Sequence, residues 1–299
     1  MSTAEYHRIP PRALILLAVL TLLWGTNWPL FPYAVREVSV WTFRAIGVTL
    51  AGATLLAVAR ARGLSLSIPR TAWRTIVTAT MFYLVLWNIA STYAAILIPS
   101  GQAAVLGFTM PLWSALISWA VLGEHLTRRI VLAVLLGTVA VTLLMVPSFE
   151  AYAQAPLGLA LGLLAGLGWA IGTLILKRSG IAVSAMVLTG WQLLICAVPT
   201  TLGALLFGDW KWFVPSWTSI AVIAYIALVP MAIGNVCWFA IVGLLPANVA
   251  GLSAIMVPVV AMISGSLVHG EPLGPLQWLA MVCSVGALSL VLLKPAGSR

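Results

Sequence analysis

Residues 99–126 read PSGQAAVLGFTMPLWSALISWAVLGEHL, and residues 246–273 read PANVAGLSAIMVPVVAMISGSLVHGEPL. Aligned at an offset of 147 residues, the two stretches share prolines, a Gly-Glu pair and apolar positions: Pro99 with Pro246, Ala103 with Ala250, Pro111 with Pro258, Val121 with Val268, Gly123-Glu124 with Gly270-Glu271, and Leu126 with Leu273. The match continues without a gap to Leu143 and Leu290. Such a shared register is improbable by chance in a chain so rich in Leu, Ala and Val. We therefore interpret the protein as two copies of one unit.

The composition is that of a membrane protein. Mean hydropathy is +1.11, 62% of residues are hydrophobic and 7% are charged, which excludes a soluble domain because that needs far more polar surface. A helix needs about 20 apolar residues to cross a bilayer, and an isolated strand would leave its backbone groups unpaired there. The charge-poor stretches predict ten helical spans: 13–33, 39–59, 73–97, 99–121, 129–146, 157–176, 183–206, 217–243, 246–268 and 275–293.

The basic residues predict the orientation of these spans. With the N-terminus in the cytoplasm, the internal segments carry twelve of them: Arg8, Arg12, Arg60, Arg62, Arg70, Arg74, Arg128, Arg129, Lys177, Arg178, Lys294 and Arg299. Only Arg36 and Lys211 fall outside, and Arg44 lies within a span. Cytoplasmic loops of membrane proteins carry an excess of Lys and Arg, so both termini are expected inside. The same bias accounts for the net charge of +9 and removes the need for a nucleic-acid partner.

The duplication predicts an inverted arrangement. Each half holds five spans, an odd number, so the second copy enters the membrane upside down relative to the first. The expected fold is an all-α membrane protein with ten transmembrane helices in two inverted five-helix repeats. The first repeat covers 1–146, an external linker covers 147–156, and the second repeat covers 157–299. Many carriers place a substrate site between such repeats near the bilayer midplane.

Two motifs carry a resemblance to a known family. The first span contains Leu23-Trp24-Gly25-Thr26-Asn27, and spans 4 and 9 each close with Pro-x11-Gly-Glu. With ten spans in two halves, the chain resembles the drug/metabolite transporter superfamily, in particular EamA-type bacterial exporters of aromatic and other neutral amino acids. The resemblance implies a bacterial inner-membrane exporter whose central cavity is lined by spans 1, 3, 4, 6, 8 and 9. Export as the direction rests on it alone.

Polar and aromatic side chains within the spans are the candidate substrate-binding residues. Polar groups at membrane depth are costly unless they face protein or water. The candidates share such a position: Trp24, Asn27, Trp28, Tyr83, Trp87, Asn88, Gln102, Trp169, Thr173, Asn235, Trp238 and Asn248. Packing between helices is the alternative for each of them, because Asn and Thr also join helices. The glycines of span 6 are interpreted as close helix contacts.

Charged residues near the span ends allow more than one interpretation. Arg44 lies near the external end of span 2, where a long side chain can reach the interface; the alternative is that it attracts a substrate carboxylate. Glu124 and Glu271 occupy equivalent positions at opposite membrane faces, about 30 Å apart. They therefore cannot form one catalytic pair. We expect each of them to cap or tether the short loop that follows it, and a role in gating is the alternative.

The function classes can now be compared. An enzyme needs convergent His, Cys or carboxylate groups, which the spans lack, so we expect no enzyme, metal or cofactor. A carrier of neutral, especially aromatic, amino acids fits best, because aromatic walls with a few amide and hydroxyl groups suit a ring, an amino group and a carboxylate. Export of other small metabolites or of cationic or aromatic drugs is the alternative. The expected partners are the small-molecule substrate and the bilayer, with a monomeric carrier.

Overall fold

The computed structural model describes residues 10–98, 100–146, 153–208, 215–245, 254–269 and 273–292. Within this part of the chain every secondary-structure element is a helix. The elements of the first half are α1 Pro11–Gly25, η1 Trp28–Leu30, α2 Phe31–Ala34, α3 Val40–Ala61, η2 Arg70–Ala72, α4 Trp73–Thr80, η3 Met81–Leu86, α5 Trp87–Leu97, α6 Ser100–Gly107, α7 Met110–Ala120 and α8 Arg128–Met145. Those of the second half are α10 Pro156–Ser179, α11 Ala185–Phe207, α12 Trp217–Ile226, η5 Ala227–Ile233, α13 Gly234–Leu244, η6 Ala254–Met256, α15 Val257–His269 and α16 Pro275–Leu292.

The helices have the length and composition of membrane spans. Among the described residues, 7 helical segments are long and apolar enough to cross a bilayer. Three shorter apolar helices, Val105–Ala120, Val257–Val268 and Pro275–Leu290, fall inside the expected spans 99–121, 246–268 and 275–293. The all-helical membrane architecture is as predicted, whereas the count of ten spans and the inversion of the repeats stay predictions.

Two of the expected continuous helices are broken, and proline explains both breaks. α1 ends at Gly25 rather than running to residue 33, because Pro29 has no N–H to bond the carbonyl of Gly25 four residues earlier. Instead, Ser264 Oγ donates to that carbonyl at 3.2 Å. The expected span 99–121 likewise divides into α6 and α7 at Gly107, four residues before Pro111. The prediction of single helices over 13–33 and 99–121 was therefore wrong in detail.

Two π-helices recur at the offset that relates the repeated stretches. η3 lies between α4 and α5, and η5 lies between α12 and α13. Adding 147 to the bounds of Met81–Leu86 gives 228–233, which falls within Ala227–Ile233. A π-helix inside an α-helix is uncommon and often marks a functional site. Both halves thus carry the same irregularity at the same place.

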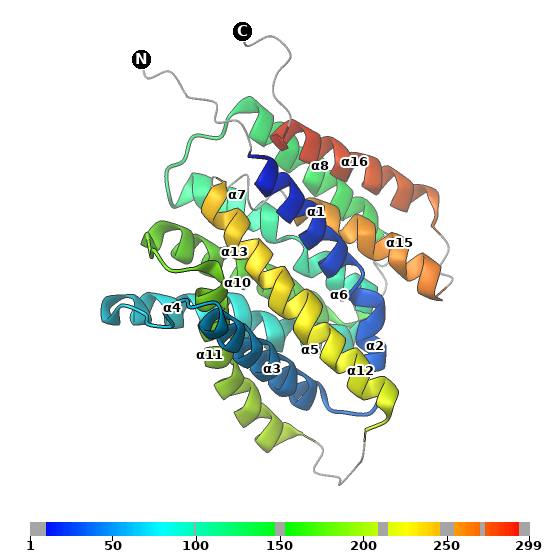
Figure 1. Ribbon diagram of the computed structural model, residues 1–299. Coiled ribbons are helices and arrows are strands. Elements are labelled where there is room, and N and C mark those ends of the chain that lie inside the picture. The colour runs from blue at the N-terminus through cyan, green and yellow to red at the C-terminus, as the bar shows by residue number, and fades with distance from the viewer. Residues whose placement is uncertain are drawn as a thin grey trace, which may run out of the picture.

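Helices at equivalent positions in the two halves make equivalent contacts (Figure 1). α3 packs along α11 and α8 packs along α16, so equivalent spans of the two halves contact each other. α1 packs on α13, and α10 in the same way packs on α5. Each of these contacts in one half thus has an equivalent contact in the other, and the rings of Trp24 on α1 and Trp169 on α10 lie 5.2 Å apart.

Small residues let α10 approach its neighbours closely. A Cβ on Gly162 would lie 2.7 Å from the Leu106 side chain, and one on Gly168 would lie 2.8 Å from the Phe82 carbonyl oxygen. Gly172 is closer still, because its Cβ would lie 2.5 Å from Tyr83 Cβ. The glycines of this span are close helix contacts, as the sequence predicted.

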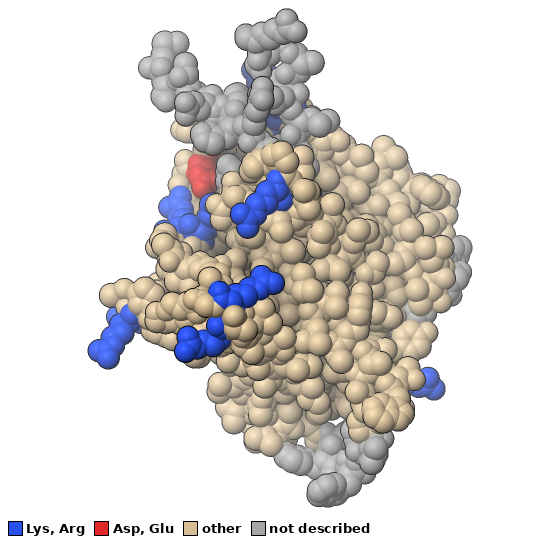
Figure 2. Space-filling view, in the orientation of Figure 1, with Lys and Arg blue, Asp and Glu red and all other residues tan. Residues whose placement is uncertain are grey.

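Most charged side chains of the described residues lie on helix ends and loops rather than within the helices. Figure 2 shows the visible Lys and Arg gathered mainly on the left of the view, around the end that holds α4, beside a broad uncharged surface. There Arg178 lies 3.9 Å from Glu124 and donates to the Leu122 carbonyl at 3.3 Å. This ion pair ties the α7–α8 loop to the end of α10, the tethering role expected for Glu124.

A second carboxylate forms a link between two other elements. The Ser216 N–H, at the start of α12, donates to Glu37 in the α2–α3 loop at 2.9 Å. This bond, helped by the hydroxyls of Ser219 and Ser216, holds the pKa of Glu37 below its ordinary value of 4.5. The folded state therefore favours the ionised form of Glu37.

Candidate functional site

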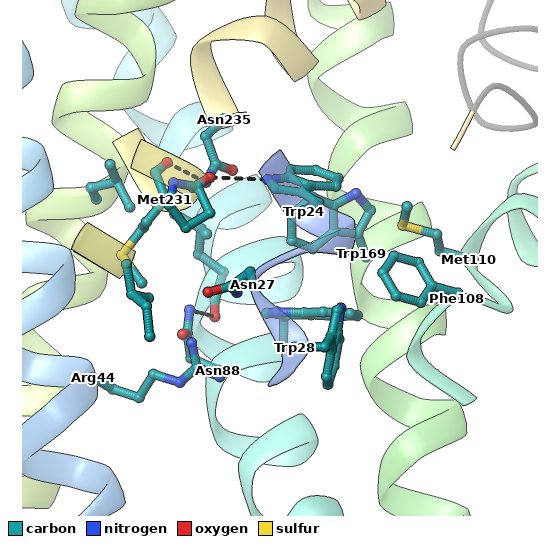
Figure 3. Close-up of a pocket in the computed structure, with 15 residues that line it drawn as sticks. Trp24, Asn27, Trp28, Arg44, Asn88, Phe108, Met110, Trp169, Met231 and Asn235 are labelled. Atoms are coloured by element: carbon teal, nitrogen blue, oxygen red, sulfur yellow. Dashed lines mark hydrogen bonds between the residues drawn. The ribbon is translucent and has the colours of Figure 1, made fainter. Parts of the chain in front are cut away.

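A small cavity lies where the broken helices and the π-helices meet (Figure 3). It encloses about 80 Å³, which is room for a few water molecules. Its walls come from both halves of the chain: Trp24, Asn27, Trp28, Arg44, Leu84, Trp87, Asn88, Phe108, Met110, Trp169, Leu193, Ile226, Pro230, Met231 and Asn235. Among these residues there is no Asp, Glu or His.

The break after α1 positions three of the lining residues. Trp24 lies in the last turn of α1, Asn27 lies in the turn that follows, and Trp28 begins the 3-10 helix η1. Trp24 Nε1 donates to the carbonyl of Pro230 at 3.0 Å, which fixes the indole against η5. Gly234 makes this contact possible, since a Cβ there would lie 2.4 Å from Trp24 Nε1.

The aromatic wall is a continuous set of ring contacts centred on Trp169. The ring of Trp169 lies 5.2 Å from that of Trp24 and 4.9 Å from that of Trp87 in edge-to-face geometry. Tyr83 and Trp238 pack against the same indole at 5.4 Å and 6.0 Å. Offset and edge-to-face pairs are the favoured arrangements of aromatic rings. The rings of Trp24, Trp87 and Trp169 therefore form one packed wall of the cavity, with Tyr83 and Trp238 behind it.

Amide groups supply the polar part of the lining. Asn88 Nδ2 donates to the Leu84 carbonyl at 2.7 Å, and Asn235 Nδ2 donates to the Met231 carbonyl at 2.7 Å. Both side chains are almost fully buried. The Oδ1 atoms of Asn27, Asn88 and Asn235 make no hydrogen bond within the described residues. The cavity thus offers acceptors without partners beside its aromatic wall.

Arg44 adds the only positive charge among the lining residues. It projects from α3, and Figure 3 shows its side chain reaching toward Asn88. Its Nε donates to Thr92 Oγ1 at 3.4 Å. A second, very small cavity beyond the first is also lined by Arg44 and Asn88. The sequence favoured an interfacial position for Arg44, whereas the structure places it in the cavity wall.

The lining has no metal-binding character. The described residues contain no cluster of three or more His, Cys, Asp or Glu side chains that could hold a metal ion. The arrangement of aromatic rings, amide oxygens and one guanidinium can recognise a small molecule by shape and hydrogen bonding.

Comparison with known proteins identifies the family. The chain matches the EamA-like transporter family twice, over residues 11–146 and over 156–293. It belongs to this family. Full-length relatives include the uncharacterized transporter YvbV of Bacillus subtilis, 26% identical with 88% of this chain and 85% of the relative covered. Another is the uncharacterized inner membrane transporter YedA of Escherichia coli, 26% identical with 93% and 89% covered.

A solved structure shows the same fold. One crystal structure superposes with a TM-score of 0.78 over 93% of this chain and 96% of the other, at 21% sequence identity. At this identity the likeness extends to the fold alone. Together with the family match, it makes this EamA protein a multi-pass membrane transporter whose relatives are described as inner membrane transporters.

Seven of the twelve candidate binding residues of this EamA protein line the cavity. They are Trp24, Asn27, Trp28, Trp87, Asn88, Trp169 and Asn235. Tyr83, Thr173 and Trp238 are buried and are not among the lining residues. Tyr83 Oη instead donates to Gln192 Oε1 at 3.0 Å. The side chain of Gln102 and all of Asn248 lie outside the described residues.

The cavity also includes residues outside the twelve candidates, among them Arg44, for which contact with a substrate carboxylate was the alternative interpretation. Arg44 and Leu193 bring in α3 and α11, which the family resemblance left outside the lining. Phe108 and Met110 enter because α6 stops at Gly107 and the chain turns there. Pro111 was the available signal for this turn. The sequence did not decide the position of Arg44, since a residue near a span end can either reach the interface or contact a substrate carboxylate.

Proposed function

We propose that this EamA transporter exports neutral, especially aromatic, amino acids across the bacterial inner membrane by alternating access through the central cavity. The observation that carries the proposal is the lining itself: an aromatic wall, three buried amide oxygens and one guanidinium, with no acidic side chain among the residues listed above. An aromatic ring can pack on the indoles while the amides and Arg44 face polar groups of an amino acid. The export direction follows the family resemblance.

The size of the cavity supports a transport cycle. At about 80 Å³ it is smaller than typical ligand sites of about 300–1,000 Å³, so a ring-bearing substrate requires the helices around it to separate. Ile98 and Leu245, at the ends of α5 and α13, are both buried. On this proposal we expect the substrate to occupy a wider conformation of the same cavity.

Flux measurements in proteoliposomes test the proposal. We expect uptake of labelled tryptophan, phenylalanine and methionine by vesicles that contain the purified protein and not by empty vesicles. Trp169→Ala should reduce tryptophan flux by about tenfold or more, because it removes the ring at the centre of the wall. Trp278→Ala is the matched control, since Trp278 lies on α16 and is 55% exposed, and its flux should equal that of wild type. Movement of organic cations or sugars alone would refute the amino-acid assignment.

A further inference from the structure

The two asparagines of the cavity have the same local geometry in the two halves of the chain. Asn88 and Asn235 stand 147 residues apart, and each lies in the first turn of the helix that follows a π-helix. Each uses Nδ2 to donate to the backbone carbonyl four residues earlier, in both cases at 2.7 Å. That carbonyl can only accept, so the atom facing it must be the amide nitrogen. The orientation of both side chains is thereby fixed.

The remaining oxygen of each side chain is left for another group. Asn88 and Asn235 are 3% and 5% exposed, and neither Oδ1 has a hydrogen-bond partner among the described residues. Buried polar atoms in folded proteins are nearly always satisfied, so acceptors without a protein partner at a cavity are available to a ligand or to water. Both residues line the same cavity, and Asn27 adds a third such oxygen between them in the view of Figure 3.

The three amide oxygens of Asn27, Asn88 and Asn235 suit a cation that carries several hydrogen-bond donors. A carbonyl oxygen accepts and cannot donate, whereas an ammonium group has three donors and no acceptor. Two or three amide oxygens can take these hydrogens without placing a formal negative charge in the membrane, where an ionised carboxylate would be expensive. Arg44, on the side of Asn88 in Figure 3, is placed for the negative end of the same molecule.

We propose that Asn88 and Asn235 form a repeat-related pair that binds the ammonium group of the substrate, with its carboxylate directed toward Arg44. This inference rests on the proposed function and assigns the orientation of the amino acid within the cavity.

Threonine substitutions separate the loss of the amide oxygen from the loss of the structural hydrogen bond that Nδ2 makes. In this protein a Thr hydroxyl donates to the carbonyl four residues earlier, as Thr142 does to Thr138 at 2.9 Å. Asn88→Thr and Asn235→Thr can therefore keep the bond to Leu84 or Met231 and remove the amide oxygen. Thr142→Ala, which loses such a bond on α8 away from the cavity, is the matched control. Thermal unfolding of each purified variant checks that the fold is retained.

Equilibrium binding of three related compounds provides the test. Tryptophan carries both polar groups, tryptamine lacks the carboxylate, and indole-3-propionate lacks the amino group. We expect each threonine variant to weaken tryptophan and tryptamine binding by about tenfold, as for the loss of a hydrogen bond to a charged group. Indole-3-propionate binding should change less than twofold. The Thr142→Ala control should bind all three as wild type does.

The outcomes separate this inference from the proposed function. Equal weakening of all three compounds, or unchanged tryptophan binding in both variants, would overturn the ammonium site. Failure of wild type to bind either amine would overturn it as well. If wild type binds tryptamine with the expected sensitivity to both substitutions but does not transport tryptophan, the ammonium site holds and the amino-acid assignment fails.

Discussion

Replacing Gly172 by alanine should separate the two helices that support the aromatic wall. The added Cβ would lie 2.5 Å from Tyr83 Cβ, 2.6 Å from the Ala79 carbonyl oxygen and 2.8 Å from the Tyr83 backbone nitrogen. Two of these atoms are backbone, and Tyr83 is fully buried with its hydroxyl bonded to Gln192. No flexible side chain can move aside, so α10 must shift away from α4 and η3.

The expected loss follows from two opposing effects. Overpacking of a well-packed core costs about 1–3 kcal/mol, and alanine regains up to about 1 kcal/mol over glycine in a helix interior. With the full regain the difference is about 0–2 kcal/mol, and because two of the clashing atoms are backbone we expect Gly172→Ala to lose about 2 kcal/mol of unfolding free energy. Gly243→Ala is the matched control, because Gly243 is also helical and a Cβ there meets nothing within 4 Å. That variant should be as stable as wild type or slightly more stable.

Thermal unfolding of the purified proteins in one detergent measures the difference. The melting temperature of Gly172→Ala should fall by a few degrees relative to wild type, while that of Gly243→Ala should stay level or rise. Two variants with the same melting temperature would show that the close approach of α10 to Tyr83 does not limit stability. The reasoning about the glycines of α10 would then be wrong.

Three further predictions concern pH, access and energy. Because the Ser216 N–H lowers the pKa of Glu37, ionised Glu37 stabilises the folded state above pH 4.5, and this stabilisation is lost as pH falls through the folded-state pKa. The melting-temperature difference between wild type and Glu37→Gln should therefore vanish in acid. A constant difference would contradict this. Cysteines at Ile98 and Leu245 should change labelling in opposite senses when substrate is added, and parallel changes would contradict alternating access. Under an imposed pH gradient without membrane potential, the substrate concentrations on the two sides should merely become equal, since no described lining residue is a carboxylate or His that could carry a proton. Sustained uphill accumulation of substrate would contradict facilitated transport.

Composition and repeats were sufficient for the class and the general architecture of the protein. Apolar stretches of membrane length indicate a membrane protein, and in an isolated span only a helix pairs all the backbone N–H and C=O groups. The breaks inside the spans were harder, although Pro29 and Pro111 stood in the sequence. A proline inside a membrane helix can also produce a kink without ending the helix, so the residue type alone did not decide the outcome at Gly25 and Gly107.

The candidate site was only partly accessible from sequence for a geometric reason. Helical spacing shows which residues share a face but not how far that face lies from the cavity. Tyr83 and Trp238 share faces with lining residues, yet neighbouring rings fill the space in front of them. The π-helices change the spacing itself and have no residue pattern that marks them. The direction in which the Arg44 side chain points depends on how α3 packs, which the sequence does not show.

The packing indicates which contacts give way when the cavity widens. α10 is held close to α5, α6 and η3 through its glycines, and α1 is held close to α13 and α15, where a Cβ on Gly25 would lie 2.5 Å from Val260. The cavity lies between these two groups of helices. Ring pairs join the two groups, Trp24 with Trp169 in the cavity wall and Tyr83 with Phe239 behind it.

Each ring pair contributes about 0.5–1.5 kcal/mol beyond its buried area, and an aromatic substrate that enters can replace it with an equivalent contact. The glycine contacts have no such replacement, because no substrate reaches between those helices. We therefore expect the two groups to move as bodies that separate across the aromatic wall. On this account the indoles that pack against one another in the cavity wall are the same groups that receive the substrate ring, so ring packing and substrate binding use one surface.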